Sequence, residues 1–410
     1  MRISWVGVGK LGYPCGLAAA ARGHHVQGYD SNVELRRAIR EEAFDLPEGD
    51  LEDMRERARG RFSIHETLGE ALEGAELILC AVQTPHEEHL DGSQVVPKGT
   101  WKDFDYSYLK QSLLEIAKCP GEAPVVIVST VRPGTTRREL APLLPRRALF
   151  YMPSFIAMGT AVRDFLEPEF YLVGKATKET PAEELREFVG KFAKAPLLEM
   201  EWASAEMAKV CYNTFIGFKI MLANTVAGMA KHVGHCDPFD VMRAIQKAHR
   251  RVASGAYMMP GMGDGGGCHP RDNLVMAGLC GEANLPYNPF DFVMEVREEQ
   301  TRELARVVQM HAKKELPVVI LGKGFKLRTP LTTGSPSVLL GNILQTEFGV
   351  PVTFYDPLLG LTTLPKGKAV YVLGQPDEEF LKLPFAEGSI LVSPWEVKEV
   401  PQGVTLDNLL

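Results

Sequence analysis

Short unbroken apolar runs alternate with helical patterns through the first 150 residues of the chain. The first run covers residues 2–8 and ends in glycines, and an alanine-rich helical segment follows over residues 11–22. Unbroken apolar runs are typical of parallel strands that are buried on both faces. Because strands and helices alternate at this spacing, the pattern predicts a doubly wound parallel sheet. The further predicted strands lie at residues 25–30, 76–82, 124–129 and 148–152.

The second half of the chain begins with a long helical pattern, from Ser204 to about Val233, that contains no proline and few glycines. New strands are predicted from Pro317 and at residues 352–357 and 369–373, with a helix over residues 337–346. This indicates a second, smaller α/β domain. The expected fold class is therefore α/β, with two Rossmann-like doubly wound domains joined by a long central helix. The expected division is an α/β domain over residues 1–200, a central helical segment over 201–300 and a second α/β domain over 301–410.

Composition narrows the class of protein. The chain has 410 residues, 45% hydrophobic and 24% charged, as expected of a globular protein with more than one domain. Its net charge of −7 argues against nucleic acid as the main partner, because a phosphate backbone requires a basic surface. The seven cysteines are odd in number and scattered, which favours reduced thiols in the cytoplasm. We expect no signal peptide, since Met1 runs directly into the first strand, and no membrane segment, since no uncharged run reaches ~20 residues.

Three glycines follow the first predicted strand in the pattern G-x-G-x-x-G, in the segment Gly7-Val-Gly9-Lys10-Leu11-Gly12. In a strand–turn–helix unit, the first glycine makes the tight turn and the second lets the backbone approach a pyrophosphate. The third allows the helix to pack closely on the strand. We therefore expect a dinucleotide to bind along this turn, with Lys10 and Leu11 beside it at the N-terminus of the helix.

Asp30 ends the second predicted strand. An acidic residue there can accept hydrogen bonds from both ribose hydroxyls and would repel a 2′-phosphate, which favours NAD over NADP as the cofactor. Two alternatives stay open. One is FAD, although no further flavin motif is present, and the other is a glycine-rich turn that binds no ligand.

A second glycine-rich segment, Gly261-Met-Gly-Asp-Gly-Gly-Gly-Cys-His-Pro-Arg-Asp272, carries a single thiol at Cys268. Its glycines would allow the backbone to pass close to a sugar ring without obstruction by side chains. A helix beginning just after the cysteine would favour its thiolate through the helix dipole. A turn cysteine without a chemical role is the alternative interpretation.

Five motifs in a common order make the chain resemble the sugar-nucleotide 6-dehydrogenase family, which includes the UDP-glucose and GDP-mannose dehydrogenases. Besides the Gly261–Asp272 block, they are Val82-Gln-Thr84-Pro85, Ser129-Thr130-Val-Arg-Pro-Gly-Thr135, Ala205–Asn213, and Gly322–Lys326 with Ser335-Pro336. The resemblance implies an NAD domain, a central helical segment that forms a homodimer, and a C-terminal domain that closes over the nucleotide sugar. It also implies two successive NAD-dependent oxidations of a primary alcohol to a carboxylate. UDP-glucose is the first substrate to expect.

In this type of reaction a thiolate traps the intermediate aldehyde at C6 as a thiohemiacetal, which loses hydride to give a thioester. The resemblance assigns that role to Cys268. Lys209 and Asn213 are spaced i, i+4 and project from one helical face, where they could hold an ordered water and stabilise an oxyanion. Without the resemblance, a solvated helix face would explain this pair equally well. The resemblance further implies that Asp272 orients Lys209 or the water, and that Thr130 binds the same water.

The remaining site residues follow from the same motifs. Cofactor contacts are expected from Thr84 and Thr130, and from Arg271, which could instead meet a substrate phosphate. No metal is expected, because His86 and His89 have no third ligand placed by sequence. Substrate contacts are expected at Ser154, Phe155, Lys209, Asn213, Tyr257, Gly261 and Lys326.

The chain departs from the family at the motif N-P-E-F-x-x-E-G, where it has Met152-Pro-Ser154-Phe-Ile-Ala-Met158-Gly159. Both glutamates are absent. In the family the first takes part in acid–base steps, and a serine cannot carry a proton in this way near neutral pH. The segment 86–105 is also longer than the usual family loop, and Thr333 stands where the family has an arginine.

Three functions are compatible with these departures. The first is an acid-forming dehydrogenase in which thioester hydrolysis is slow, or in which another base, such as Asp272, is recruited to it. The second is a diverged enzyme that catalyses a two-electron or redox-neutral conversion of a related nucleotide sugar. The third is a non-catalytic protein that binds NAD and a nucleotide sugar.

Overall fold

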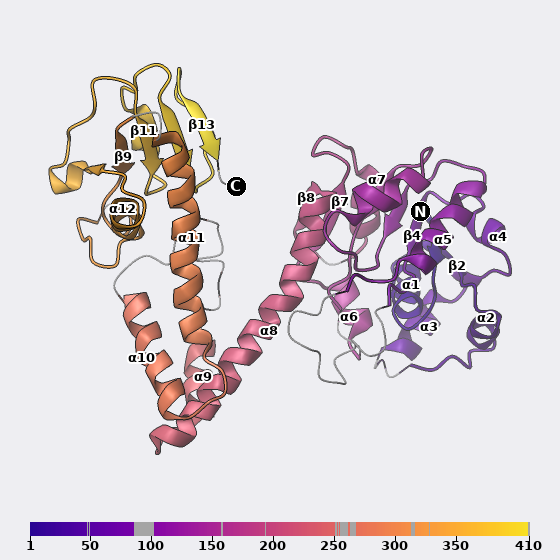
Figure 1. The fold of residues 1–410 in the computed structure, drawn as a ribbon. Coiled ribbons are helices and arrows are strands. Elements are labelled where there is room, and N and C mark those ends of the chain that lie inside the picture. Colours follow the sequence, from indigo (N-terminus) through magenta and orange to yellow (C-terminus); the bar gives the residue numbers. More distant parts are fainter. Residues whose placement is uncertain are drawn as a thin grey trace. The chain divides into compact units, whose positions relative to one another are not determined.

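The structure is a computed structural model that describes residues 1–46, 48, 50–85, 102–156, 159–192, 194–250, 252, 254, 261–262, 268–312, 316–327 and 329–408. At positions 220, 231, 268, 269, 271, 272 and 275 it describes the backbone only. The chain divides into two compact units, Met1–Phe218 and Lys219–Leu410, with the boundary inside a long helix (Figure 1).

A sheet of eight strands forms the centre of the first unit. Its order is β3-β2-β1-β4-β5-β6-β7-β8, and neighbouring strands pair in parallel except β6 with β7. A sheet that grows outward from β1 in both directions is doubly wound, which confirms the predicted architecture. The strands are β1 (Arg2–Val6), β2 (His25–Tyr29), β3 (Phe62–Ile64), β4 (Leu77–Cys80), β5 (Val125–Ile127), β6 (Leu149–Tyr151), β7 (Tyr171–Lys175) and β8 (Leu197–Glu201).

Helices cover both faces of this sheet and form two apolar clusters. In β4, Leu77 and Leu79 pack in the cluster that contains α1, whereas Ile78 packs in the cluster that contains α5. Burial on both faces explains the unbroken apolar sequences of β4 and β5. The helices of this unit are α1 (Gly12–Ala21), α2 (Val33–Arg40), α3 (Leu51–Ala58), α4 (Leu68–Leu72), α5 (Ser107–Lys118), α6 (Ala161–Leu166) and α7 (Glu183–Val189).

The helix α8 (Trp202–Val233) has 32 residues and extends from the first unit into the second, as predicted for the long central helix. Its first two turns are anchored on the sheet. The indole Nε1 of Trp202 donates to the backbone oxygen of Leu149 at 3.2 Å. The fully buried carboxylate of Glu206 accepts hydrogen bonds from the backbone N–H of Gly134 at 2.5 Å and of Thr136 at 2.7 Å.

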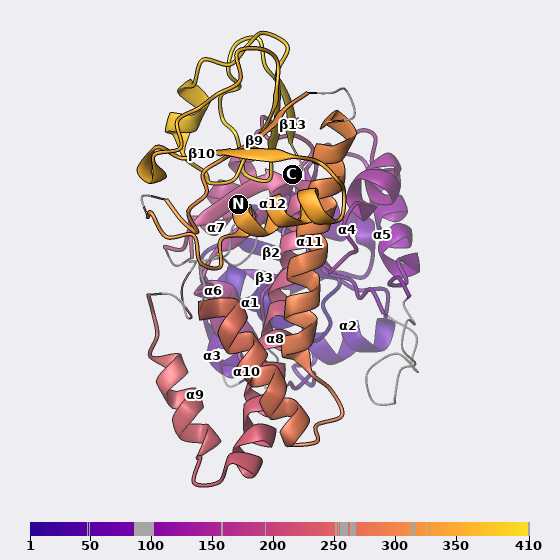
Figure 2. The ribbon, with the colours of Figure 1, turned by 60° about the vertical axis from the view of Figure 1, so that its left-hand side comes forward.

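The second unit contains the end of α8, a group of helices and a second sheet. Met229 of α8 packs with Cys280 and Phe290 in a small apolar cluster. Figures 1 and 2 show α10 and α11 side by side, and residues of both belong to this cluster. Among the described residues, no helix has the length and hydropathy required to cross a bilayer. The helices are α9 (Pro238–Gln246), α10 (Cys268–Glu282), α11 (Pro289–Ala312) and α12 (Pro336–Thr346).

The second sheet has five parallel strands in the order β10-β9-β11-β12-β13. Its middle strand, β11, is buried along its whole length, and α11 and α12 pack on one face of the sheet. This is the predicted second α/β domain, and β12 and β13 extend it beyond the strands that the sequence predicts. The strands are β9 (Val318–Leu321), β10 (Val352–Tyr355), β11 (Val370–Leu373), β12 (Ile390–Ser393) and β13 (Thr405–Asn408).

The role of the Glu206 carboxylate in anchoring α8 can be tested by removing it. Glu206→Ala removes the acceptor of the buried Thr136 N–H, at a cost of ~1–3 kcal/mol, and also the acceptor of the half-buried Gly134 N–H. We expect the free energy of unfolding to fall by at least that amount, as measured by urea denaturation with tryptophan fluorescence. The control is Glu201→Ala, because this carboxylate pairs with Arg137 in a solvent-accessible ion pair. Equal losses in the two variants would contradict the anchoring role.

Candidate functional site

The turn between β1 and α1 has the geometry of a dinucleotide-binding turn. Gly7 has a φ of +91°, which favours glycine. A Cβ on Gly12 would lie 1.9 Å from the backbone oxygen of Gly7, so helix and turn are in direct contact. A Cβ on Gly9 would meet nothing within 4 Å, which leaves open space above the N-terminus of α1. Lys10 and Leu11 complete the turn, and the helix N-terminus favours an anion there.

The carboxylate of Asp30 is held beside this turn at the end of β2. One oxygen accepts from the backbone N–H of Val8 at 3.1 Å and the other from that of Asn32 at 3.0 Å. The backbone N–H of Gly7 donates to the carbonyl of Tyr29 at 2.8 Å. These bonds tie the first turn to the end of the second strand, where an acidic residue can accept hydrogen bonds from ribose hydroxyls.

Thr84 and Thr130 lie together after the carboxyl ends of β4 and β5. The Thr84 hydroxyl donates to the backbone oxygen of Thr130 at 2.8 Å. The Ser129 hydroxyl donates in the same way to the carbonyl of Val82. In an open parallel sheet this edge is where ligands bind, so the two predicted threonines occupy a suitable position.

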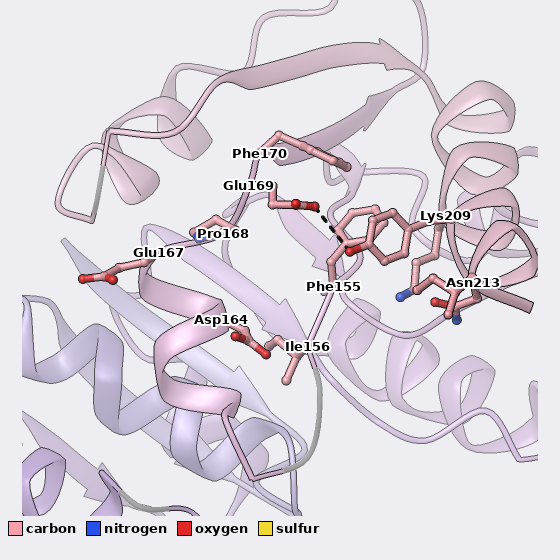
Figure 3. A pocket seen from close by; sticks show the side chains of 11 residues that line it. Phe155, Ile156, Asp164, Glu167, Pro168, Glu169, Phe170, Lys209 and Asn213 are labelled. Atoms are coloured by element: carbon pink, nitrogen blue, oxygen red, sulfur yellow. Dashed lines mark hydrogen bonds between the residues drawn. The ribbon is translucent and has the colours of Figure 1, made fainter. Parts of the chain in front are cut away.

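A cavity of about 370 Å³ opens beside α8 within the first unit (Figure 3). It brings together three of the predicted site residues, Phe155, Lys209 and Asn213. Ser154 is half-buried next to Phe155 in the sequence and is not part of the cavity wall. The complete lining is Phe155, Ile156, Asp164, Glu167, Pro168, Glu169, Phe170, Lys209, Tyr212, Asn213 and Ile216.

Lys209 is the buried cation of this cavity, with 7% of its surface exposed. Its Nζ lies 4.7 Å from the centre of the Phe155 ring, at a distance suited to a cation–π interaction. Burial lowers the pKa of Lys209, because removal from water disfavours the charged form. Asn213 follows one turn later on the same wall. This arrangement can donate hydrogen bonds to an oxygen that becomes negative during a reaction.

Tyr212, Glu169 and Phe170 are cavity residues that the sequence analysis did not identify. The Tyr212 hydroxyl donates to a carboxylate oxygen of Glu169 at 3.4 Å. Its ring centre lies 4.8 Å from that of Phe155, and that of Phe170 lies 4.9 Å from Phe155. Burial, and secondly the Glu169 carboxylate, raise the pKa of Tyr212. Tyr212 lies three residues after Lys209, a spacing that places both on one helical face and could have identified it.

The second unit repeats the geometry of the first turn at the end of β9. Gly322 has a φ of +88° and its N–H donates to the carbonyl of Tyr355 at 2.8 Å. One carboxylate oxygen of Asp356 accepts from the backbone N–H of Lys323 at 2.9 Å, as Asp30 does from Val8. The predicted residue Lys326 is exposed in the loop that follows, where the Gln375 side chain donates to its carbonyl at 3.1 Å.

The remaining predicted residues belong to the second unit or lie outside the described residues. Gly261 lies against Trp395, because a Cβ on it would come within 1.8 Å of the indole ring. The backbone of Cys268 begins helix α10, which is the position expected to favour a thiolate. Tyr257, Met158 and residues 86–101 are outside the described residues, as are the side chains of Cys268, Arg271 and Asp272. The described residues contain no group of three or more His, Cys, Asp or Glu that could hold a metal ion.

These features define a dinucleotide-binding protein with two Rossmann-like sheets and a lysine-containing cavity beside its central helix. The sequence model of the UDP-glucose/GDP-mannose dehydrogenase family matches the chain in two places, its NAD binding domain at residues 1–192 and its central domain at residues 203–299. The matches together cover more than half of the chain. The protein therefore belongs to the UDP-glucose/GDP-mannose dehydrogenase family, whose cofactor is NAD.

Individual relatives are distant but cover most of the chain. GDP-mannose 6-dehydrogenase of Pseudomonas aeruginosa is 27% identical, over 84% of this chain and 78% of its own. UDP-glucose 6-dehydrogenase of Rhizobium meliloti is 27% identical, over 87% and 82%. Among solved structures, a ternary complex of GDP-mannose dehydrogenase from Pseudomonas aeruginosa has a TM-score of 0.84 at 24% identity and covers 99% of both chains. A UDP-glucose dehydrogenase from Pyrobaculum islandicum has a TM-score of 0.54 at 25% identity, over 99% and 96%.

The glycine turn allows a matched pair of substitutions. Gly12→Ala places a methyl group against the Gly7 backbone, so we expect a lower thermal midpoint together with loss of NAD binding. Gly9→Ala meets no protein atom, so we expect an unchanged midpoint but weaker NAD binding, because the methyl group occupies the path of the pyrophosphate. Thermal unfolding and fluorescence titration with NADH separate the two effects. Unaltered NADH affinity in Gly9→Ala would contradict the assignment of this turn.

Proposed function

We propose that the protein is an NAD-dependent dehydrogenase that oxidises the C6 hydroxyl of a nucleotide sugar to the uronic acid. The observation that carries this proposal is the buried ammonium of Lys209, which stands over Phe155 and beside Asn213 in a cavity of the NAD-binding unit. A buried cation with an amide beside it can stabilise the alkoxide and the oxyanion that form at C6. Family membership supports the same reaction class.

In this proposal each residue has a separate task. NAD bound along the Gly7–Gly12 turn would accept the hydride in each of the two oxidations. Cys268 attacks the C6 aldehyde to form a thiohemiacetal, which becomes a thioester when its hydride leaves. Lys209 and Asn213 stabilise the negative oxygen at C6. Asp272 orients Lys209 or the water that hydrolyses the thioester, and Thr130 binds that water.

The family motifs also imply contacts with the nucleotide sugar. We assign Ser154, Phe155, Tyr257, Gly261 and Lys326 to these contacts. Arg271 is assigned to the cofactor or to a substrate phosphate. We propose UDP-glucose as the substrate and GDP-mannose as the first alternative, because relatives of this chain are named as dehydrogenases of these two compounds. Because the chain lacks both glutamates of the family motif, our second candidate is an enzyme that releases the aldehyde after one oxidation.

Product stoichiometry tests the reaction directly. With a panel of UDP- and GDP-sugars, we expect two NADH for each sugar oxidised. One NADH would favour the aldehyde-forming alternative. If a sugar nucleotide binds but no member of the panel yields NADH, a non-catalytic protein is favoured and the proposal is wrong.

The role of the Cys268 thiol is tested by replacing its sulfur with oxygen. Cys268→Ser is expected to bind NAD and the sugar nucleotide with unchanged affinity but to form no uronic acid, because a serine hydroxyl is a far weaker nucleophile than a thiolate. Calorimetric titration measures binding, and mass spectrometry measures the acid. Acid formation at the wild-type rate would contradict the covalent route.

We also propose that the protein is a cytoplasmic homodimer that associates through α8. This helix exposes large apolar side chains at Phe215, Ile216, Phe218, Met221 and Leu222, which a partner would remove from water.

A charge placed on this helix face tests the dimer. Phe218→Asp is expected to convert the dimer to monomers, because Phe218 is 59% exposed on α8 and a carboxylate cannot be buried there without a partner. Val33→Asp is the matched control, since Val33 is also 59% exposed but lies on α2. Sedimentation velocity gives the masses. A dimer that survives Phe218→Asp would exclude this interface.

A further inference from the structure

The proposed acid-forming reaction needs a group that accepts a proton from water, and the chain has Ser154 where the family has a glutamate. A general base is most effective when its pKa lies near the working pH, which excludes the serine hydroxyl. Carboxylates are nevertheless present in the cavity. Those of Asp164, Glu167 and Glu169 all line it, although none of them was expected from the sequence.

Glu169 forms a hydrogen bond to α8, on the helical face that also carries Lys209. Its Oε2 accepts the Tyr212 hydroxyl at 3.4 Å, and the dashed line in Figure 3 marks this hydrogen bond. Lys209 and Tyr212 are spaced i, i+3, and both contact the Phe155 ring, at 4.7 and 4.8 Å from its centre. The phenol of Tyr212 therefore lies beside the proposed oxyanion site, with Glu169 behind it.

The two other carboxylates are placed less favourably. Asp164 already accepts the Thr160 hydroxyl at 2.6 Å and pairs with Arg163. Figure 3 shows the Glu167 side chain directed away from Lys209. Glu169, by contrast, accepts a hydrogen bond from α8 through the Tyr212 hydroxyl.

On the basis of the proposed function, we infer that Tyr212 and Glu169 form a proton relay that replaces the missing motif glutamate. Water attacks the thioester carbon, its proton passes to the Tyr212 oxygen, and the Tyr212 proton passes to Glu169. The bond from the carbonyl carbon to the Cys268 sulfur then breaks. The products are the carboxylic acid, the Cys268 thiolate and protonated Glu169, so atoms and charge balance.

The environment of each group suits its part in the relay. Burial, and the neighbouring Glu169, raise the pKa of Tyr212, so the phenol keeps its proton near neutral pH. It must therefore give up one proton as it takes another, as a hydroxyl that is both donor and acceptor can. Glu169 is exposed and can return the proton to solvent after each turnover.

The relay is tested with Glu169→Gln and Tyr212→Phe, and with Glu167→Gln as the matched control on the same cavity wall. Rapid mixing with sugar nucleotide and NAD separates the burst of NADH from steady-state turnover. We expect an unchanged burst in all three variants. Steady-state acid release should fall by on the order of 10²–10⁴ in Glu169→Gln and Tyr212→Phe only, because these variants lack the proton acceptor.

Two further readouts separate a lost proton acceptor from a general structural defect. The acyl-enzyme at Cys268 should accumulate in the mass spectrum of Glu169→Gln. Ser154→Glu in the Glu169→Gln background should restore turnover by returning a carboxylate to the motif. Acid release in Glu169→Gln equal to that of Glu167→Gln would overturn the relay alone. Absence of NADH in the wild-type protein would overturn the relay together with the proposed function.

Discussion

The burial of the Glu206 carboxylate is the constraint on which the cavity depends. A carboxylate without exposure to water is stable only if its hydrogen bonds are made, and here two backbone N–H groups from the segment after β5 make them. The same bonds hold the first turns of α8 against the sheet. Lys209 lies one turn further along this helix, so its burial over Phe155 follows from where Glu206 is fixed. A loop, a helix and a cation are thus positioned by one acidic side chain.

Local patterns predicted much of the fold. The β1–α1 turn follows from glycines that lie within six residues of one another, since turn geometry and helix packing are decided by neighbours in the chain. The spacing of Lys209 and Asn213 likewise placed both on one helical face. The strands β7 and β8 were not predicted: β8 has the sequence Leu-Leu-Glu-Met-Glu, which has neither an unbroken apolar run nor a clear alternation.

The part of the cavity that sequence reasoning missed depends on contacts between distant segments. Tyr212 and Glu169 are 43 residues apart, and nothing in either local sequence indicates that they meet. The motif at Ser154 and Glu169 both lie in the connection between β6 and β7, and because these strands pair antiparallel the chain reverses its direction there. A parallel βαβ pattern gives no sign of such a reversal. Departures from a family motif therefore have to be judged from the three-dimensional surroundings of the altered position.

The continuity of α8 has a consequence for how this chain can change in length. A helix of 32 residues rises about 1.5 Å and turns about 100° for each residue. Insertion or deletion of a single residue between Asn213 and Met229 would turn the helical face that carries Met229 by that angle relative to the face that carries Lys209. A loop can absorb such a change, but a continuous helix cannot. The number of residues in this stretch of α8 therefore sets the angle between these two faces of the helix.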